Sequence, residues 1–563
     1  SEKWFAKSKA QKLLPLVYPF LEAPLEDFCS LWNKEYAVYN TACILDEQLY
    51  GLGVASELTR TYDELMKEKN VLCIDDSNVL LKNIIDGSDA PFVYEKLGVR
   101  FEHFLLDEFQ DTSKVQWQNF SPLLHNSDSQ GGENLIVGDV KQSIYRWRGS
   151  DWKLLDKIIP GEFKNHKETV LDTNWRSLPE IVRFNNDFFT SAANIIDRID
   201  GKEENGQMSM IYADVCQNPA RKGAAGGSVS VTFCPKDQEL QKVLEAVDEV
   251  RESGGCLSDI AVLVRSNASG ETVAGYLIEN GIPVITDDSM KVKKSITVRR
   301  LVSLMSYIDN QEDTVSAYLA ESLDVQLPDS SLSLVDMVES LFRSLKKSDV
   351  DGLWRGELLH VQSFMDSVQD YASANGNALR GFLKWWDDQN PSISSPSSGE
   401  SVRIMTIHKS KGLDFPYVII PFAENISLYK PDSRWCVPSL TGSGLEGVAE
   451  GVYDVCLSSS SAETLFADDY SEEVFLQHVD NINTLYVAMT RASLGMHVIA
   501  AQPSSTLFKA LKAGDLTGFK NLSQILYWYV SSSGSCENVR HSAEDGSERF
   551  DVGVMVDFSA FVK

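Results

Sequence analysis

Two acids stand side by side directly after a short apolar stretch. Phe104–Leu106 has the character of the end of a buried strand, and Asp107 and Glu108 follow it. In α/β proteins, ligand chemistry is placed at this edge of the sheet, where parallel strands end. Two adjacent carboxylates repel each other, so a pair at this position is best explained by a bound cation. Mg²⁺ carrying nucleotide phosphates is the usual candidate.

A helix start signal fixes where these acids lie. Ser113 and Gln116 have the spacing of a capping box, in which two side chains satisfy N–H groups at the N-terminus of a helix. The pattern predicts a helix over residues 112–125 and a second strand over residues 134–137. An Asp-Glu pair by itself more often belongs to a solvated loop. Only the longer string DEFQDT, residues 107–112, makes a ligand site the better interpretation.

Aromatic and cationic residues alternate in a second notable stretch. Tyr145 and Trp147 offer flat faces on which nucleic-acid bases stack, and Arg146 and Arg148 offer guanidinium groups for phosphates. By itself Trp147 would more often be a core residue, but the string GDVKQSIY directly upstream favours nucleic-acid binding. We therefore interpret this stretch as a turn that contacts a nucleic acid.

Length and composition describe an ordinary globular protein of several units. The chain has 563 residues, too many for one hydrophobic core, and about three compact units are expected. With no run of eighteen apolar residues and no apolar stretch at its start, we expect a cytoplasmic protein without a membrane partner. The nine cysteines include no Cys-x-x-Cys pair, so neither a disulfide framework nor a zinc or iron-sulfur site is indicated.

The formal net charge of −29 argues against a nucleic-acid partner, because affinity for a phosphate backbone comes mainly from Lys and Arg. Net charge is a sum over the whole surface, however, whereas a binding channel is local. The clusters at residues 141–148 and 409–411 could line one positive groove. We expect the excess acids on outer faces or against a partner. The loop-rich acidic stretch 423–480 is interpreted as such a solvated face, with Glu446, Glu450, Asp468, Asp469, Glu472 and Glu473.

Strand and helix patterns divide the chain into blocks. Residues 1–97 and 296–400 have helical spacing with few strand signals, whereas the segments between and after them alternate short strands with helices. Residues 229–233, with apolar residues at every second position, predict a half-buried strand, and residues 260–265 a fully buried one. A Gly- and Ala-rich stretch at residues 217–227 predicts a loop, and 392–401 a linker.

Five strings, in this order, resemble motifs of the UvrD/RecB branch of superfamily 1 helicases, and of AddA and RecB chains in particular. They are DEFQDT at 107–112, GDVKQSIYRWRG at 138–149, LDTNWRSL at 171–178, VRIMTIHKSKGLDF at 402–415 and NTLYVAMTRA at 483–492. The resemblance implies an α/β fold with two RecA-like parallel-sheet motor domains, the first incomplete, and inserted helical domains.

The resemblance also implies a domain order. It assigns residues 1–97 to a helical 1B-like region, 98–170 to a partial domain 1A, 171–295 and 401–505 to the two parts of domain 2A, 296–400 to a helical 2B-like insertion, and 506–563 to a linker toward a nuclease domain.

The implied cofactors are ATP and Mg²⁺. By the match to the family motifs, Asp107 would hold Mg²⁺ and Glu108 would orient or deprotonate the attacking water. Gln142 and Arg176 would contact the γ-phosphate, and Arg491 would act as an arginine finger. An arginine finger contributes about 10³ to 10⁵ in rate.

Three more residues would bind the nucleotide. Trp175 would stack on the adenine, at a position where the family usually has Tyr. Lys411 would lie near the phosphates, and Asp414 would bind the ribose hydroxyl, where the family more often has Glu. The shorter acid would need a water molecule to reach.

The implied DNA-binding residues come from two motifs. Tyr145, Trp147 and Arg148 belong to the first, and Thr406 and His408 to the second. The plain alternative for His408 is an ordinary loop histidine.

One expected motif is missing. A P-loop requires Gly-x-x-x-x-Gly-Lys-Ser/Thr, and the chain has a single Gly-Lys pair, Gly201-Lys202, without the other residues of that pattern. We therefore expect a piece of a longer AddA- or RecB-like chain that does not hydrolyse ATP appreciably by itself.

The implied function is that of an ATP-dependent 3′ to 5′ DNA helicase and translocase. It would be a subunit of an AddAB- or RecBCD-type helicase-nuclease that acts on single- and double-stranded DNA ends in double-strand break repair and recombination. Its partners would be RecA, acting downstream, together with an AddB- or RecC-like subunit. The alternative is a non-catalytic module, derived from a UvrD-like helicase, that binds DNA or a partner. The retained acids and arginines speak against such a loss of the motor.

Overall fold

The computed structural model describes most of the chain. The described residues are 7–85, 101–163, 166–201, 206–220, 226–286, 291–323, 325–328, 332–348, 352–355, 357–393, 400–512, 515–516, 518–532, 538–541 and 546–554. Several sequence predictions fall outside them: positions 1–6 and 86–100 of the N-terminal regions, Lys202 of the Gly-Lys pair, positions 221–225 of the predicted loop, 394–399 of the predicted linker, and 555–563 at the end.

The largest element of the fold is an eight-stranded sheet with the strand order β13-β14-β5-β12-β9-β6-β8-β7. The strands from β5 to β7 pair in parallel, and β13 and β14 are added antiparallel at one edge. The bounds are β5 Gly227–Cys234, β6 Ile260–Val264, β7 Val284–Thr286, β8 Val402–Thr406, β9 Phe415–Ile420, β12 Ala492–Ala501, β13 Asn538–His541 and β14 Glu548–Val554. This parallel sheet with helices confirms the predicted α/β fold class.

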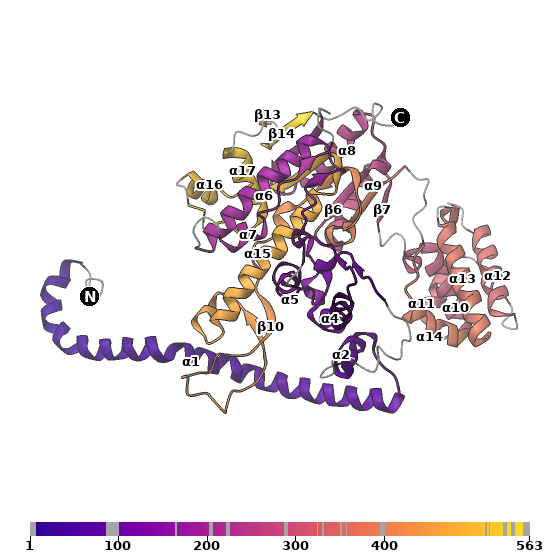
Figure 1. Cartoon of the computed structure of the whole chain (residues 1–563). Coiled ribbons are helices and arrows are strands. Elements are labelled where there is room, and N and C mark those ends of the chain that lie inside the picture. The colour runs from indigo at the N-terminus through magenta and orange to yellow at the C-terminus, as the bar shows by residue number, and fades with distance from the viewer. Residues whose placement is uncertain are drawn as a thin grey trace.

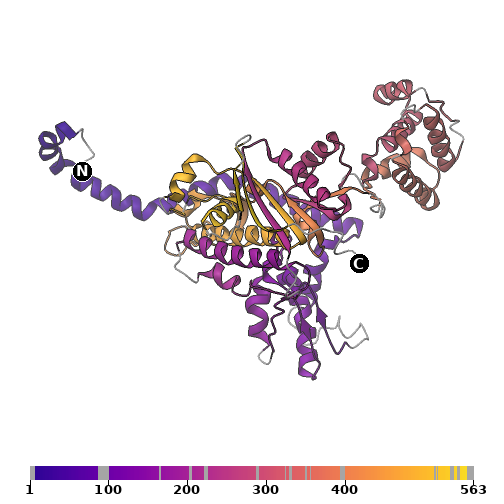
Figure 2. The ribbon, with the colours of Figure 1, turned by 90° about the horizontal axis from the view of Figure 1, so that it is seen from above.

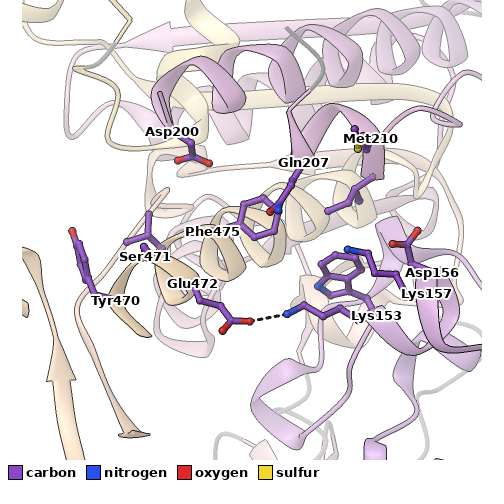
Figure 3. Close-up of a pocket in the computed structure, with 13 residues that line it drawn as sticks. Lys153, Asp156, Lys157, Asp200, Gln207, Met210, Tyr470, Ser471, Glu472 and Phe475 are labelled. Atoms are coloured by element: carbon purple, nitrogen blue, oxygen red, sulfur yellow. Dashed lines mark hydrogen bonds and ion pairs between the residues drawn. The ribbon is translucent and has the colours of Figure 1, made fainter. Parts of the chain in front are cut away.

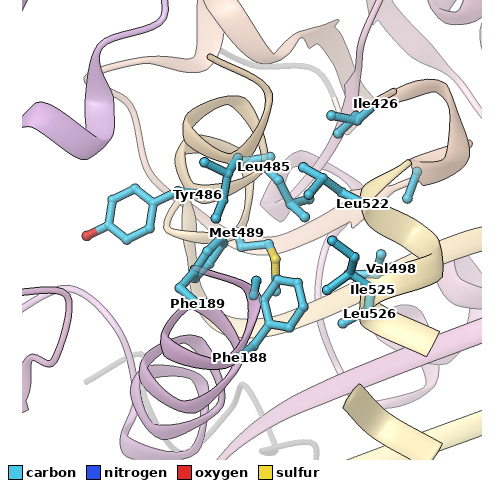
Figure 4. Packing of buried hydrophobic residues seen from close by; sticks show 14 of the residues in the cluster. Phe188, Phe189, Ile426, Leu485, Tyr486, Met489, Val498, Leu522, Ile525 and Leu526 are labelled. Atoms are coloured by element: carbon cyan, nitrogen blue, oxygen red, sulfur yellow. The ribbon is translucent and has the colours of Figure 1, made fainter. Parts of the chain in front are cut away.

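Helices cover both faces of this sheet. One face carries α6 (Pro179–Ile199), α15 (Ala467–Met489) and α17 (Leu522–Ser532), whose apolar side chains form one continuous core with the strands. Figure 4 shows Phe188 and Phe189 of α6 packed beside Met489 of α15. The other face carries α8 (Glu239–Glu252) and α9 (Asn267–Glu279). The C-terminal half of α15, from Val479 on, packs on the sheet, whereas its N-terminal half extends from the sheet toward α1 (Lys7–Lys69) and β10 (Asp432–Cys436) (Figure 1).

The strand predicted as half-buried is buried on both faces. Val229, Val231 and Phe233 enter the core, and Ser230 and Thr232 between them are buried as well. The alternating pattern suggested a solvated face, but β5 lies inside the sheet, between β14 and β12, and is covered by helices on both sides.

A smaller α/β unit holds the two adjacent acids. β1 (Leu105–Leu106) and β2 (Leu135–Ile136) pair in parallel, and α4 (Lys114–Ser129) connects them. The predicted capping box is present, with Gln116 N donating to Ser113 Oγ over 3.2 Å and Ser113 N donating to Gln116 Oε1 over 2.9 Å. The prediction of a buried strand is wrong for Leu105, which is 74% exposed. The reason is that β1 has β2 as its sole strand neighbour among the described residues.

The N-terminal region is helical where it is described. α1 (Lys7–Lys69) is one long helix, and α2 (Ile74–Ile85) packs against α4. Figures 1 and 2 show the N-terminal part of α1 projecting away from the rest of the molecule. Leu45, near the middle of α1, packs in a small core with the hairpin of β10 (Asp432–Cys436) and β11 (Tyr453–Leu457).

A separate helical lobe follows β7. Its helices are α10 (Ile296–Asp309), α11 (Thr314–Ser322), α12 (Leu334–Ser348), α13 (Leu358–Asn375) and α14 (Leu379–Asp388). They share a core of their own, in which the rings of Phe364 and Trp386 lie 4.8 Å apart. Figure 1 shows this lobe at the right, beside the sheet domain. Among the described helices, none is both long and apolar enough to cross a bilayer.

Two predictions for the C-terminal third need correction. The acidic stretch 423–480 is not one solvated face, because α15 already begins at Ala467 and Glu473 on it is buried, with 4% of its surface exposed. The segment predicted as a linker, 506–563, contains α16 (Ser505–Lys512), α17, β13 and β14. Arg549 of β14 binds Glu249 of α8, so the described part of this segment belongs to the sheet domain.

A buried histidine in this sheet predicts a pH dependence of stability. His497 of β12 is buried, with 4% of its surface exposed, and burial lowers its pKa from 6.5 to about 4. Between these values the unfolded chain binds a proton that the folded chain does not, so the free energy of unfolding falls as the pH falls. From pH 7 to pH 5, His497 should cost about 2 kcal/mol of stability.

Urea unfolding at both pH values measures this loss. The wild type should lose about 2 kcal/mol more than His497→Gln, whereas His166→Gln, at an exposed histidine, should behave as the wild type. Equal losses in the wild type and His497→Gln would contradict the assignment.

Candidate nucleotide and DNA site

The two acids occupy a strained turn after β1. Glu108 has φ +51°, a left-handed conformation that is uncommon for residues with a side chain, and its N–H donates to Asp107 Oδ1 over 2.8 Å. Both carboxylates are exposed. The turn therefore holds two acids at the end of the strand, where the sequence predicts them.

A buried glutamine joins this turn to the motif after β2. Gln110 donates to Glu108 Oε2 over 2.5 Å and accepts from Asp139 N over 3.0 Å. A side chain at Gly138 would place its Cβ 2.7 Å from Gln110 Oε1, so glycine is needed at that position. Asp139 in turn accepts from Gln142 Nε2 over 3.0 Å. The predicted γ-phosphate sensor is thus connected to the acids through three hydrogen bonds.

Lys411, from the segment between β8 and β9, reaches across to the acids. Its Nζ donates to both carboxylate oxygens of Asp111 (2.7 and 2.6 Å) and to the carbonyl of Gln142 (2.9 Å), and lies 3.6 Å from Glu108 Oε2. The side chain is 6% exposed. Burial raises the pKa of Asp111, and Lys411 acts against this rise. This contact places a residue of the large sheet domain beside the acids of the small unit.

The two predicted phosphate-contacting arginines lie close to each other. Arg491 is 1% exposed, and three of its N–H groups donate to Val487 O, Leu413 O and Thr490 Oγ1 over 2.9 to 3.1 Å. Arg176 is exposed and donates to the carbonyl of Thr490 over 3.2 Å. Burial and then the charge of Arg176 lower the pKa of Arg491 to about 10. Two neighbouring guanidinium groups favour an anion between them.

Two acids affect the pKa of Arg491. Glu108 and Asp414 both raise the pKa of Arg491, against the larger effects of burial and Arg176. The structure therefore brings Glu108, Lys411, Arg176 and Arg491 into one region, with Asp414 at its exposed margin. Trp175 precedes Arg176 in an exposed turn and is itself 78% exposed, so a flat face is open to solvent there.

The residues predicted to bind DNA form a second group next to the first. The Tyr145 hydroxyl donates to the carbonyl of His408 over 2.8 Å, and their rings lie 6.0 Å apart. Trp147 is 68% exposed, 6.4 Å from the Tyr145 ring, and the Arg148 guanidinium lies 5.5 Å from the Trp147 ring centre. Lys411 Nζ is 5.3 Å from the centre of the Tyr145 ring, so one lysine contacts both groups.

His408 is neutral in the neutral pH range. Burial, followed by the charge of Arg265, lowers its pKa to about 4. It can therefore contact a ligand as a hydrogen-bonding imidazole but not as a cation. Thr406 is the last residue of β8, is half-buried and stands two residues before His408.

Sequence reasoning missed Arg265 and Asp111 as site residues. Arg265 directly follows the buried strand β6 and acts on His408. The sequence signal that could have indicated Arg265 is its position directly after the buried strand β6. Asp111 stands within the DEFQDT string, but its partner Lys411 lies 300 residues further along the chain.

Two cations of the cluster at 141–148 do not line a groove, contrary to the prediction. Lys141 is buried and paired with Asp139 (2.9 Å) and Asp214 (2.7 Å). Arg146 is paired with Glu473 and Asp480 of α15. Of this cluster, Arg148 is the arginine whose side chain accompanies the exposed Trp147.

A cavity of about 770 Å³ lies apart from both groups of predicted residues. Residues within 152–157, 200–211 and 470–475 line it, and an ion pair of 2.7 Å between Lys153 and Glu472 crosses its wall (Figure 3). None of the predicted nucleotide- or DNA-binding residues is among those that line it.

The acids fit the protein part of a magnesium-nucleotide site. Mg²⁺ in such sites takes one or two carboxylates together with phosphate and water oxygens. Asp107 is exposed, and no described cation forms an ion pair with it. In the described part of the chain, no group of three or more His, Cys, Asp or Glu could hold a metal ion. Nucleotide phosphates would therefore have to complete the ligand set.

Both halves of the chain match family models of helicases. The UvrD/REP helicase N-terminal domain matches residues 33–160, and the UvrD-like helicase C-terminal domain matches residues 169–344 and 338–502. The chain is 23% identical to the exonuclease/helicase subunit RexA of Streptococcus pneumoniae over 538 residues, covering 79% of this chain and 43% of that protein.

Two other relatives carry related names. RecBCD enzyme subunit RecB of Chlamydia pneumoniae is 24% identical over 64% of this chain and 36% of its own length. DNA helicase II of Haemophilus influenzae is 28% identical over 50% of this chain and 32% of its own length. The chain spans less than half the length of these relatives. The matched family domains extend over more than half of the chain, and the chain therefore belongs to the UvrD-like helicases.

Proposed function

We propose that the intact protein is an ATP-dependent 3′ to 5′ DNA helicase and translocase. It is a subunit of an AddAB- or RecBCD-type helicase-nuclease that processes double-strand breaks in the cytoplasm. Its substrates are single- and double-stranded DNA ends, its partner in the complex is AddB- or RecC-like, and RecA acts on its product. The names of two relatives, exonuclease/helicase subunit RexA and RecBCD enzyme subunit RecB, support this proposal.

One observation supports the motor in particular. Lys411 of the sheet domain binds Asp111 of the small unit and lies 3.6 Å from Glu108, while its Nζ also lies 5.3 Å from the Tyr145 ring centre. Acids, a lysine and an aromatic ring from two different units are thus adjacent. A module that only binds a partner has no use for this convergence of polar groups.

The chemistry assigned to the nucleotide side is phosphoryl transfer to water. Asp107 and the nucleotide phosphates would hold Mg²⁺, which when bound neutralises charge on the phosphates. Glu108 orients the attacking water and accepts its proton. Gln142 and Arg176 contact the γ-phosphate, and Arg491 stabilises charge on the transferring group.

The remaining assigned residues bind the nucleoside and the DNA strand. Trp175 stacks on the adenine and Asp414 reaches the ribose. Tyr145 and Trp147 stack on bases, Arg148 binds a phosphate, and Thr406 and His408 contact the strand from the opposite domain. The exposure of Trp147 and Trp175 supports these roles, because each ring has a face open to solvent.

The intact protein should hydrolyse ATP in the presence of single-stranded DNA and unwind duplexes with a 3′ tail, but not those with a 5′ tail. The 563-residue chain should not turn over ATP, because its sequence has no Gly-x-x-x-x-Gly-Lys-Ser/Thr to hold the β- and γ-phosphates. A coupled ATPase assay measures both. Steady DNA-stimulated hydrolysis by the 563-residue chain would contradict the proposal.

In the intact protein, Arg491→Gln should lower kcat about 10³- to 10⁵-fold and leave DNA affinity nearly unchanged. Glutamine can keep part of the hydrogen bonds that the buried guanidinium makes to Val487 and Leu413. An equal loss of DNA binding would argue against the role of an arginine finger.

Trp147→Ala in the 563-residue chain should weaken binding of single-stranded DNA about 5- to 150-fold, because stacking is worth roughly 1 to 3 kcal/mol per base. Trp175→Ala is the matched control, since it removes another exposed indole, from the nucleotide group. Fluorescence anisotropy of a labelled oligothymidine measures both affinities. Equal effects of the two substitutions would contradict the separation of the two groups.

A further inference from the structure

Arg146 stands between Tyr145 and Trp147, yet its side chain turns into the protein. Its Nη1 and Nη2 donate to the two carboxylate oxygens of Glu473 over 2.8 and 2.9 Å, and its Nε donates to Asp480 Oδ2 over 2.5 Å. The guanidinium thus makes a two-pronged contact with one acid of α15 and a single contact with another. Such fork geometry is the strongest arrangement that an arginine and a carboxylate form.

Glu473 is built into its site from several sides. Besides Arg146, it accepts from Gln477 Nε2 over 2.9 Å and from Arg434 of β10 over 3.3 Å. Its side chain is 5% exposed. Burial raises the pKa of Glu473, but the hydrogen bonds from Arg146 and Gln477 outweigh this effect and hold the pKa below its ordinary value. Glu473 therefore stays ionised and remains paired with Arg146.

The contact fixes a short turn. Arg146–Arg148 forms one 3₁₀ turn, closed by Gly149 at φ +88°. Tyr145, just before it, is held by its hydroxyl on the carbonyl of His408. With Tyr145 and Arg146 both attached to the sheet domain, the next residue of the turn, Trp147, faces solvent.

The same helix extends toward the arginine pair at the other group. Glu473 lies near the start of α15, and Arg491 follows the last residue of α15, Met489, by two positions. The distance along the helix from Glu473 to Met489 is about 24 Å, at 1.5 Å per residue. A single packed helix thus connects the base-stacking turn with Arg491.

We propose that Arg146 is a positioning residue and not a DNA ligand. Its pairing with Glu473 and Asp480 holds the turn of Trp147 and Arg148 on α15, so that the turn follows any movement of that helix. The inference rests on the proposed DNA-binding role of Trp147. It assigns the single phosphate contact of this turn to Arg148.

If Arg146 were a DNA ligand, Glu473→Gln would change the DNA affinity in the opposite direction. If Arg146 were a phosphate ligand held back by Glu473, then Glu473→Gln would release it. DNA affinity would rise, and its dependence on salt would steepen by about 0.7 in the slope of log K against log salt concentration, the contribution of one phosphate of a single strand. If Arg146 positions the turn, Glu473→Gln weakens binding and does not steepen that slope.

The experiment uses the purified 563-residue chain and a labelled oligothymidine, titrated at several salt concentrations. Glu473→Gln and Arg146→Met should each weaken binding about fivefold or more, equivalent to roughly one weakened base stack, and neither should steepen the slope. Arg148→Met should reduce the slope by about 0.7. Glu472→Gln is the matched control: it removes the same charge from the neighbouring residue, which pairs with Lys153 at the cavity wall (Figure 3). Its affinity should stay near that of the wild type.

Two outcomes would overturn the inference: a gain in affinity for Glu473→Gln, or a salt slope that is steeper for Glu473→Gln than for the wild type. If Trp147→Ala fails to weaken binding, the proposed DNA role of the turn is wrong. If Trp147→Ala weakens binding and Glu473→Gln does not, the positioning role alone is wrong. Thermal unfolding of each variant shows whether it is folded. Arg146→Lys, which keeps the charge and loses the fork, should weaken binding as Arg146→Met does, because the fork and not the charge sets the turn.

Discussion

The ion pair between Lys411 and Asp111 is the contact on which the site depends. A lysine with 6% of its side chain exposed has lost nearly all of its hydration, and this loss is compensated only if every donor finds an acceptor. Here its three donors bind two oxygens of Asp111 and the carbonyl of Gln142. The lysine comes from the large sheet domain and the acceptors from the small unit. Removing either side would leave a buried charge without its partner.

Other hydrogen bonds around this ion pair connect the same two units. Asn483 of α15 donates to the carbonyls of Val140 and Ser143, and Arg146 binds Glu473. Tyr145 binds the carbonyl of His408. Most of these contacts involve the segment after β2, which begins beside the acids at Asp139 and ends at Tyr145 and Trp147. For the proposed function, this short connection is the route by which nucleotide binding would affect DNA binding.

The sequence allowed the local features of this site to be predicted, because they depend on residues close together in the chain. The capping box at Ser113 and the buried strand β6 follow from spacing and hydrophobic pattern. The five motif strings allowed the family to be identified. Arg146 and Lys141 could not be assigned in this way, because their partners Glu473 and Asp214 are 327 and 73 residues away. A cation in a DNA-binding string and a cation in an internal ion pair have the same appearance in the sequence.

Double-mutant analysis of Lys411 and Asp111 tests the convergence of the two units most directly. The free energy of unfolding is measured in urea for the wild type, Lys411→Met, Asp111→Asn and the double variant. We expect a coupling energy of about 1 to 3 kcal/mol, because each charge depends on the other for its compensation. Losses that add to within about 0.5 kcal/mol would mean that the two residues do not interact in solution, and would contradict a shared site.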